Sequence, residues 1–299
     1  MAIHIRRTRT PAIEPEGAIR IGSVRTFLDA LEKFDRPTQT TFFFRGHSNF
    51  TYTLKPSIYR DEGWIQNEDV LFKELILRCP NDFSDQQSTF QTLVKMQHYS
   101  LPTRLLDLTA NPLVALFFAC TAGGDPQESG EVLVFRVPTR EIKYFDSDTV
   151  SVISNISRRP KGFEVPSSKL TEKQFNATTE IGYLLHEIKH EKPYFEPSIV
   201  RAHLESVVCV KPKMDNPRII RQDGAFLLFG VSGTKMSPAC VPPEYFANEN
   251  SSRILVIPQE KKRMLKQLEA LGITQGTIYP EIERVAEYIK TTYKAQSES

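Results

Sequence analysis

An arginine follows three consecutive phenylalanines in the segment Phe42–His47. The β-branched and aromatic run Thr40–Phe44 predicts a buried strand, and Arg45-Gly46 predicts a tight turn at its end. A guanidinium cannot lie unpaired in an apolar layer, so Arg45 either pairs with an acid or faces a pocket. In a pocket it would fork two hydrogen bonds onto a phosphate or carboxylate, with Gly46 allowing close approach of the backbone. Phe44, Arg45, Gly46 and His47 are therefore candidate ligand-binding residues.

A second polar segment lies directly before an apolar run. Its polar side chains are Gln97, His98, Tyr99, Thr103, Arg104, Asp107, Thr109 and Asn111. Such density beside a deep core indicates a cleft, and we expect this segment to meet Phe42–His47 in one pocket. If residues 103–107 form a strand, Thr103 and Asp107 share one face and Arg104 lies on the other. Two alternatives stay open: His98 as a packed core imidazole, and Asp107 as the partner of Arg45 or Arg104.

The elements that would position these residues follow from hydrophobic periodicity and turn signals. Strands are predicted at Thr40–Phe44, Val132–Val137, Val207–Val210, Arg218–Arg221, Ala225–Phe229 and Arg253–Ile257. Helices are predicted to begin near Ser23, Asn67, Asn111, Gln259 and Pro280, and the apolar Leu113–Ala119 would be buried on every side. We expect one α+β domain over 21–295, with a mixed, mostly antiparallel central sheet flanked by helices. Residues 1–20 would form an extended arm, and about 147–180 a polar insertion.

The composition is that of an ordinary globular protein. The 299 residues are 40% hydrophobic and 25% charged, and a formal net charge of +2 provides no global field toward nucleic acid or membrane. The four cysteines lie far apart and are expected to be reduced. Neither a signal peptide nor an apolar run of membrane-spanning length is evident, so we expect a cytoplasmic protein with no membrane partner. Oligomeric state is not readable from the sequence.

At the two polar segments the chain resembles a known family. Phe44-Arg45-Gly46, Gln97-His98-Tyr99, the run Leu101–Asp107 and Asn111-Pro112 are similar to the signature blocks of the FRG domain, named for its Phe-Arg-Gly tripeptide. Later blocks also agree: Pro217–Ile220 followed by Gln222, Gly224 and Phe226, and Gly272-Ile273 with Tyr279-Pro280-Glu281. The family usually has Gly at the position of Ser100 and Trp at that of Leu108. The resemblance spans roughly residues 20 to 292 and implies a bacterial or phage-associated protein, with a role in phage defence or related conflict.

The family's layout is in turn similar to that of ADP-ribosyltransferases, in which an aromatic-Arg-Gly strand end grips the diphosphate of NAD. This similarity implies NAD as substrate, with Arg45 on phosphate and His98 and Tyr99 on the nucleoside. Asp107 and Gln222 would orient the ribose. Those enzymes end with a glutamate, and the matching residue here is Gln222, which cannot stabilise an oxocarbenium-like centre by charge. Asp107 or Asp223 would supply the anion, and a non-catalytic module that binds nucleotide or nucleic acid is the alternative.

Two other motifs point elsewhere. His186-Glu187-Ile188-Lys189-His190 is a literal His-Glu-x-x-His, which on a helix presents two imidazoles for zinc and a glutamate to activate water. A zinc hydrolase is therefore a second alternative, but the charged Lys189, the nearby Pro193 and the lack of a clear third ligand favour a solvated helix face, and we expect no metal. A basic loop with Arg158, Arg159 and Lys161 could contact nucleic acid. Glu164 and Glu172 dilute its charge, which favours an exposed, solvated loop.

Overall fold

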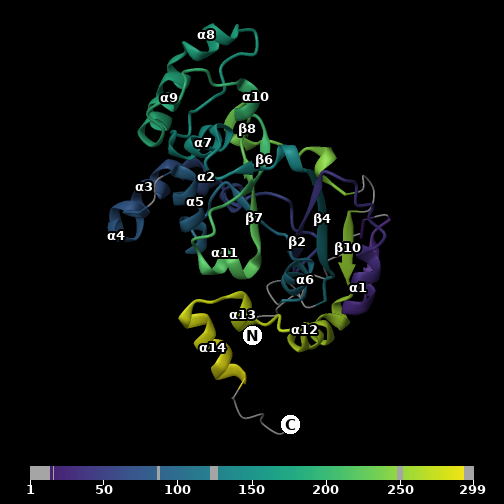
Figure 1. Cartoon of the computed structure of the whole chain (residues 1–299). Coiled ribbons are helices and arrows are strands. Elements are labelled where there is room, and N and C mark those ends of the chain that lie inside the picture. The colour runs from purple at the N-terminus through teal and green to yellow at the C-terminus, as the bar shows by residue number, and fades with distance from the viewer. Residues whose placement is uncertain (1–13, 16, 86–87, 122–126, 248–251, 293–299) are drawn as a thin grey trace, which may run out of the picture.

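A central mixed sheet organises the protein. The computed structural model describes residues 14–15, 17–85, 88–121, 127–247 and 252–292, and Figure 1 shows their arrangement. The strands are β1 Ile19–Ile21, β2 Thr40–His47, β3 Leu105–Thr109, β4 Gly130–Pro138, β5 Lys143–Tyr144, β6 Val207–Lys211, β7 Gly224–Phe229 and β10 Arg253–Val256. They form one sheet in the order β1-β10-β4-β2-β3-β7-β6-β5, and β8 Val231–Ser232 pairs separately with β9 Thr234–Pro238. The pairing is antiparallel except for β1 with β10 and β5 with β6, so the predicted α+β class with a mostly antiparallel sheet is confirmed.

The described α-helices pack around this sheet. They are α1 Val24–Leu31, α2 Glu62–Gln66, α3 Glu68–Arg78, α4 Pro80–Phe83, α5 Thr89–His98, α6 Pro112–Cys120, α7 Asp148–Asn155, α8 Glu172–Asn176, α9 Thr179–Glu191, α10 Arg201–Leu204, α11 Pro217–Gln222, α12 Lys261–Ala270, α13 Gln275–Ile278 and α14 Ile282–Thr292. Helices α1, α6 and α12 cover β2, β4 and β10 in one apolar cluster. Helices α5 and α7 cover β6 and β7 in another cluster, to which α9 contributes by packing on α7. The site lies near the boundary between these two groups of helices.

The sheet is weakly joined in the middle. Strand β2 pairs with β4 along its whole length, from Thr40 opposite Pro138 to His47 opposite Glu131. Against β3, by contrast, β2 has a single register pair, Phe44 opposite Thr109. The two strands therefore part beyond Phe44, and the backbone groups of β3 at that point need other hydrogen-bond partners. This opening creates room for side chains and a cavity.

Several sequence predictions need correction. Arg218–Arg221 was predicted as a strand, but it lies within the helix α11: the Asn216 side chain accepts a hydrogen bond from the Arg218 amide at 2.8 Å, and Pro217 occupies the first helical position. These start signals outweigh the β preference of the two isoleucines. The predicted turn at Arg45-Gly46 is also wrong, because β2 continues through Gly46 to His47.

The stretch predicted as a polar insertion is more structured than its composition indicates. Helix α7 is followed directly by a short 3₁₀ helix, Ile156–Arg158, and every residue in 148–157 except Asp148 is buried. Only α8, α9 and the loops around them extend outward, at the end of the molecule opposite α14 (Figure 1). Most of the predicted arm, residues 1–13 and 16, lies outside the described residues, while Ile19 and Arg20 belong to β1. Among the described residues, no helix has both the length and the apolarity needed to cross a bilayer.

Candidate functional site

Arg45 lies where β2 and β3 part. Its Nε donates a hydrogen bond to Nε2 of His47 at 2.8 Å, and its Nη1 donates to the main-chain carbonyl oxygen of Asp107 at 2.7 Å. The carboxylate of Asp107 is 3.8 Å from Nη1, beyond hydrogen-bond distance. Burial lowers the pKa of Arg45 to about 10, although Asp107 opposes the shift, so the guanidinium stays charged at neutral pH. A side chain that is only 13% exposed is thus fixed by uncharged partners.

His47 and Glu131 hold Arg45 from behind. Because Nε2 of His47 accepts from Arg45, the imidazole proton lies on Nδ1, which donates to Oε1 of Glu131 at 2.8 Å. Burial and the nearby cations, Arg45 first, lower the pKa of His47 to about 3. Burial raises the pKa of Glu131 to about 7, despite Arg253 lying 3.3 Å from its second oxygen. The histidine is therefore neutral and orients the guanidinium instead of exchanging protons.

Gly46 allows α6 to pack closely against β2. A Cβ built at this position would lie 1.9 Å from the carbonyl oxygen of Ala115 and 2.8 Å from the amide nitrogen of Ala119, both on α6. A Cβ built on Gly130 of β4 would lie 2.2 Å from the carbonyl oxygen of Ala119 in the same helix. The helix backbone lies directly on the two strands, which only glycine allows. Gly46 therefore has a packing role, and the close approach of a ligand to its backbone stays a prediction.

The guanidinium of Arg45 faces a cavity of about 300 Å³, which we call the Arg45 pocket. Its lining includes Phe44, Arg45, Gly46, His47, Tyr52, Arg60, Asp107, Leu108, Thr109, Phe118, Arg218 and Gln222. Among these described lining residues, three are arginines, namely Arg45, Arg60 and Arg218, and one, Asp107, carries a carboxylate. Phe118 adds an aromatic wall. The lining of the Arg45 pocket therefore combines excess positive charge with an aromatic surface.

Asp107 presents a carboxylate to this pocket. Its side chain is 60% exposed, and Oδ1 accepts a hydrogen bond from Nε2 of Gln97 at 2.7 Å. Gln97 is held in turn by the buried hydroxyl of Thr103, which donates to its Oε1. The predicted ligand-binding residues Gln97 and Thr103 thus fix Asp107, while Asp107 itself lies open to solvent at the meeting point of the two polar segments.

Gln222 and Thr109 close the far side of the Arg45 pocket. The Thr109 hydroxyl donates to the main-chain oxygen of Gln222 at 2.5 Å, and Nε2 of Gln222 donates to the Ile278 carbonyl at 3.2 Å. Asn111 caps α6, its side-chain oxygen accepting from the Leu113 amide at 3.0 Å. Asn111 therefore acts through the helix, whereas Gln222 lines the pocket.

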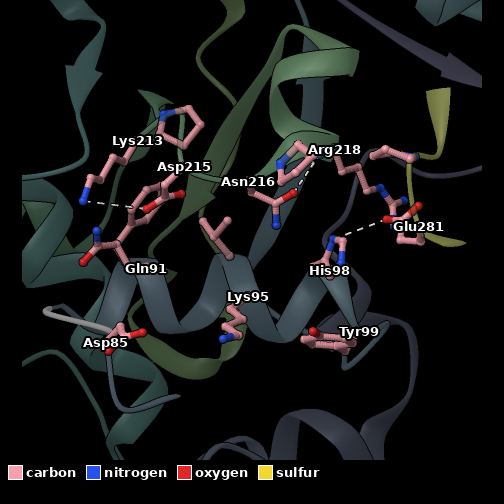
Figure 2. A pocket seen from close by; sticks show the side chains of 15 residues that line it. Asp85, Gln91, Lys95, His98, Tyr99, Lys213, Asp215, Asn216, Arg218 and Glu281 are labelled. Atoms are coloured by element: carbon pink, nitrogen blue, oxygen red, sulfur yellow. Dashed lines mark hydrogen bonds and ion pairs between the residues drawn. The ribbon is translucent and has the colours of Figure 1, made fainter. Parts of the chain in front are cut away.

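His98 and Tyr99 line a neighbouring groove of about 490 Å³, which we call the His98 groove (Figure 2). It lies between α5 and the segments around Arg218 and Glu281. Nδ1 of His98 is 3.6 Å from Oε1 of Glu281, and Nη1 of Arg218 is 3.8 Å from the same oxygen. Burial lowers the pKa of His98, with Arg218 contributing and Glu281 opposing. His98 and Arg45 thus lie in adjoining spaces and do not share the Arg45 pocket.

Arg104 is placed differently from its prediction as a ligand-binding residue. Its side chain is 0% exposed, and it donates from Nε and Nη2 to the two carboxylate oxygens of Glu68, at 2.9 and 2.5 Å. Nζ of Lys235 lies 3.1 Å from the same carboxylate. An arginine fully occupied by a buried carboxylate cannot reach a ligand in the Arg45 pocket, so Arg104 is a structural residue.

The side chains of the His-Glu-x-x-His motif and of the basic loop contact other protein groups. His186 and His190 lie one turn apart on the exposed side of α9, with their Nε2 atoms 3.2 Å apart. Glu187 is 2.7 Å from Arg158 and 3.9 Å from Arg159. No group of three His, Cys, Asp or Glu side chains within the described ranges could hold a metal ion. Glu187 therefore unites the His-Glu-x-x-His motif and the basic loop in one surface ion-pair cluster.

Sequence reasoning did not identify four residues as parts of the site. Arg60 follows a loop whose signals are weak, and Glu131 lies within an apolar strand that reads as core. Arg218 and Glu281 belong to segments that resemble family blocks, but nothing local marks them as facing a cavity. A charged residue inside an otherwise apolar strand was the one available signal, and it applied to Glu131.

Comparison with known proteins supports the family resemblance. Residues 40–128 match the family model of the FRG domain, so the chain contains an FRG domain. No curated protein and no solved structure matches the chain. The matched range holds Arg45, Gly46, Asp107 and the whole of α6. Ser100, where the family usually has Gly, has a φ of 65°, which lies in the left-handed region that favours glycine.

Proposed function

We propose that this FRG-domain protein binds a nucleotide or another phosphorylated ligand in the Arg45 pocket. The observation that carries the proposal is the state of Arg45: a charged guanidinium, oriented by a neutral histidine and a main-chain carbonyl, that faces a cavity. Phosphate would satisfy it by charge-assisted, forked hydrogen bonds. Arg60 and Arg218 add positive charge around the same cavity, and Phe118 offers a face for a base.

Binding is tested by calorimetry and thermal shift with ADP, ADP-ribose and NAD. Arg45→Ala should lower the affinity for these ligands by about 100-fold, because a hydrogen bond to a charged group contributes roughly 1.5–3 kcal/mol. The matched control is Arg78→Ala, which removes an exposed arginine from an ion pair with Glu74 on α3. Equal affinity in the Arg45→Ala variant, or no binding of any of the three ligands to the wild type, would contradict the proposal.

A finer proposal is that the ligand is NAD and the chemistry ADP-ribosyl transfer. The bond between the ribose and nicotinamide would break, with nicotinamide leaving with the bonding electron pair. An acceptor nucleophile would bond to the ribose carbon and lose a proton. Asp107 is the group available to stabilise the cationic transition state, since its carboxylate is exposed in the pocket and Gln222 is uncharged. Protein or nucleic acid would be the acceptor.

The transfer proposal has a separate test. Wild-type protein is incubated with labelled NAD and cell extract, and Asp107→Asn should abolish both NAD cleavage and transfer while retaining NAD binding. Gln97→Ala, which releases Oδ1 of Asp107, should lower the rate without abolishing it. Absence of any cleavage or transfer by the wild type would exclude this chemistry and leave the binding proposal standing.

A non-catalytic binding module is the second candidate function. Gln222 favours it, because its side chain is a neutral amide bonded to the Ile278 carbonyl, whereas the resemblance to transferases implies an acidic side chain at this position. In this case the ligand recovered from the protein after incubation has an unchanged mass. Detection of a converted product by mass spectrometry would exclude the binding module.

A further inference from the structure

The His98 groove contains buried polar atoms that lack hydrogen bonds. Within the described residues, Nδ1 of His98 and both carboxylate oxygens of Glu281 are shielded from water and have no hydrogen-bond partner. Oε1 of Glu281 lies 3.6 Å from Nδ1 of His98 and 3.8 Å from Nη1 of Arg218, and both distances are too long for a hydrogen bond. Buried polar groups normally find partners, and a carboxylate without hydrogen-bond donors is costly. Such a group beside a cavity indicates a place for donors supplied by a ligand.

The local fold keeps Glu281 at this place. Glu281 follows Pro280 directly. The main-chain oxygen of Glu281 accepts hydrogen bonds from the amides of Arg284 and Val285 in the first turn of α14. Arg218 is held over the ring of Tyr279 with its guanidinium carbon 4.9 Å from the ring centroid. Glu281 and Arg218 are therefore positioned by neighbouring structure and not by each other, which explains why they do not close into a short ion pair.

The His98 groove adjoins the Arg45 pocket. A small cavity of about 80 Å³ lies between them, lined among others by Asp107, Gln222, His98 and Arg218. Asp107 and Gln222 also line the Arg45 pocket, His98 also lines the His98 groove, and Arg218 lines all three spaces. Figure 2 shows Arg218, Glu281 and His98 grouped at one end of the groove, with Tyr99 beside His98. A ligand with phosphate at Arg45 can therefore continue past Arg218 toward Glu281.

We propose that the groove holds the ribose of a ribonucleotide, with the sugar hydroxyls donating to Glu281 and one of them hydrogen-bonded to His98. A carboxylate accepts from vicinal hydroxyls, and acidic side chains commonly recognise ribose in this way. Tyr99, a residue that is 59% exposed, offers a face on which the base can stack. The site would therefore prefer ribonucleotides to their dideoxy analogues. This inference rests on the proposed function, since it places the sugar relative to a phosphate bound at Arg45.

The experiment compares three probes by calorimetry: ADP, 2′,3′-dideoxy-ADP and inorganic pyrophosphate. Wild-type protein should bind ADP at least about tenfold more tightly than the dideoxy analogue, because a site built for a hydroxyl rejects the ligand that lacks it. Glu281→Ala should remove this difference and leave the affinity for pyrophosphate unchanged. The matched control is Asp215→Ala, a carboxylate at the opposite end of the groove (Figure 2), which should preserve the preference.

The outcomes separate this inference from the binding proposal. Equal binding of ADP and its dideoxy analogue, with both still dependent on Arg45, would overturn the ribose site and leave the phosphate pocket intact. A preference that persists in Glu281→Ala would also overturn it. Absence of binding by all three probes would overturn both. His98→Ala provides a second measurement, because it should weaken ADP binding without changing pyrophosphate binding.

Discussion

Two arginines from the FRG domain, Arg45 and Arg104, occupy opposite kinds of environment. Arg104 is buried against the ionised carboxylate of Glu68, with Lys235 beside it. Burial by itself would raise the pKa of Glu68, but Arg104 and Lys235 hold it below the ordinary value. Arg45 is held by a neutral histidine and a carbonyl, and faces a cavity. The comparison shows that the partner, and not the motif, distinguishes an arginine enclosed by a buried carboxylate from an arginine that is left facing a cavity.

The largest expected effect is on stability at Arg104. Arg104→Ala leaves Glu68 buried with only Lys235 nearby, and removing one partner of a buried pair costs about 3–5 kcal/mol. Denaturant unfolding measures this loss. In the Arg45→Ala variant, the loss of unfolding free energy should be clearly smaller, because its partners are uncharged. Similar losses at the two positions would remove the distinction between them.

Gly46→Ala separates the roles of adjacent residues in the Phe-Arg-Gly tripeptide. The added Cβ would collide with the main chain of α6, and overpacking of this kind costs about 1–3 kcal/mol or more. The melting temperature should therefore fall. Gly162→Ala is the control, because a Cβ there meets nothing within 4 Å. An unchanged melting temperature in Gly46→Ala would show that α6 does not lie directly on β2.

Glu131, which holds His47 behind Arg45, should make the unfolding free energy depend on pH. Its pKa is raised by burial from an ordinary 4.5 to about 7, so the folded state binds the proton more tightly than the unfolded state. The resulting stability is present below about pH 4.5 and is lost as pH rises through about 7. Because His47 has its pKa lowered to about 3, its contribution runs in the opposite direction between pH 3 and 6.5.

Comparing wild type with Glu131→Gln isolates the acid. The unfolding free energy of the wild type should fall relative to that of the variant by on the order of 1–3 kcal/mol between pH 4.5 and 8, since one pKa unit corresponds to about 1.4 kcal/mol. Glutamine preserves an acceptor for Nδ1 of His47. A difference that does not change with pH would mean that Glu131 is ionised throughout, as Glu68 is.

The smallest effect concerns the shape of the cation at position 45. Arg45→Lys keeps the charge but loses the planar fork and the Nε donor to His47. Affinity for ADP should fall about tenfold, less than in Arg45→Ala, and calorimetry would detect it. Affinity equal to that of the wild type would indicate that charge alone holds the ligand.

Local sequence was sufficient to predict much of the architecture. Long apolar or alternating runs predicted β2, β4, β6, β7 and β10, and Asn111-Pro112 predicted the start of the buried helix α6. These predictions succeeded because the hydrophobic periodicity of a strand or helix is visible in consecutive residues. The prediction at Arg218–Arg221 was wrong because a cap and a proline started a helix within a β-prone segment. The buried α7 was obscured by its polar residues. One of them, Asn155, is satisfied inside the fold, because its side chain accepts a hydrogen bond from the Thr89 hydroxyl and donates one to the Ser151 carbonyl.

The sequence by itself determined that a guanidinium stands at the end of an aromatic run and that polar side chains crowd the approach to an apolar helix. It could not determine which arginine pairs with which acid. Glu68 reaches Arg104, and Lys235 reaches Glu68, from distant parts of the chain, and Glu131 reaches His47 across a strand pair. Charge pairing and cavities arise from contacts between segments far apart in sequence. Only the tertiary structure therefore decided that Arg45 faces open space while Arg104 does not.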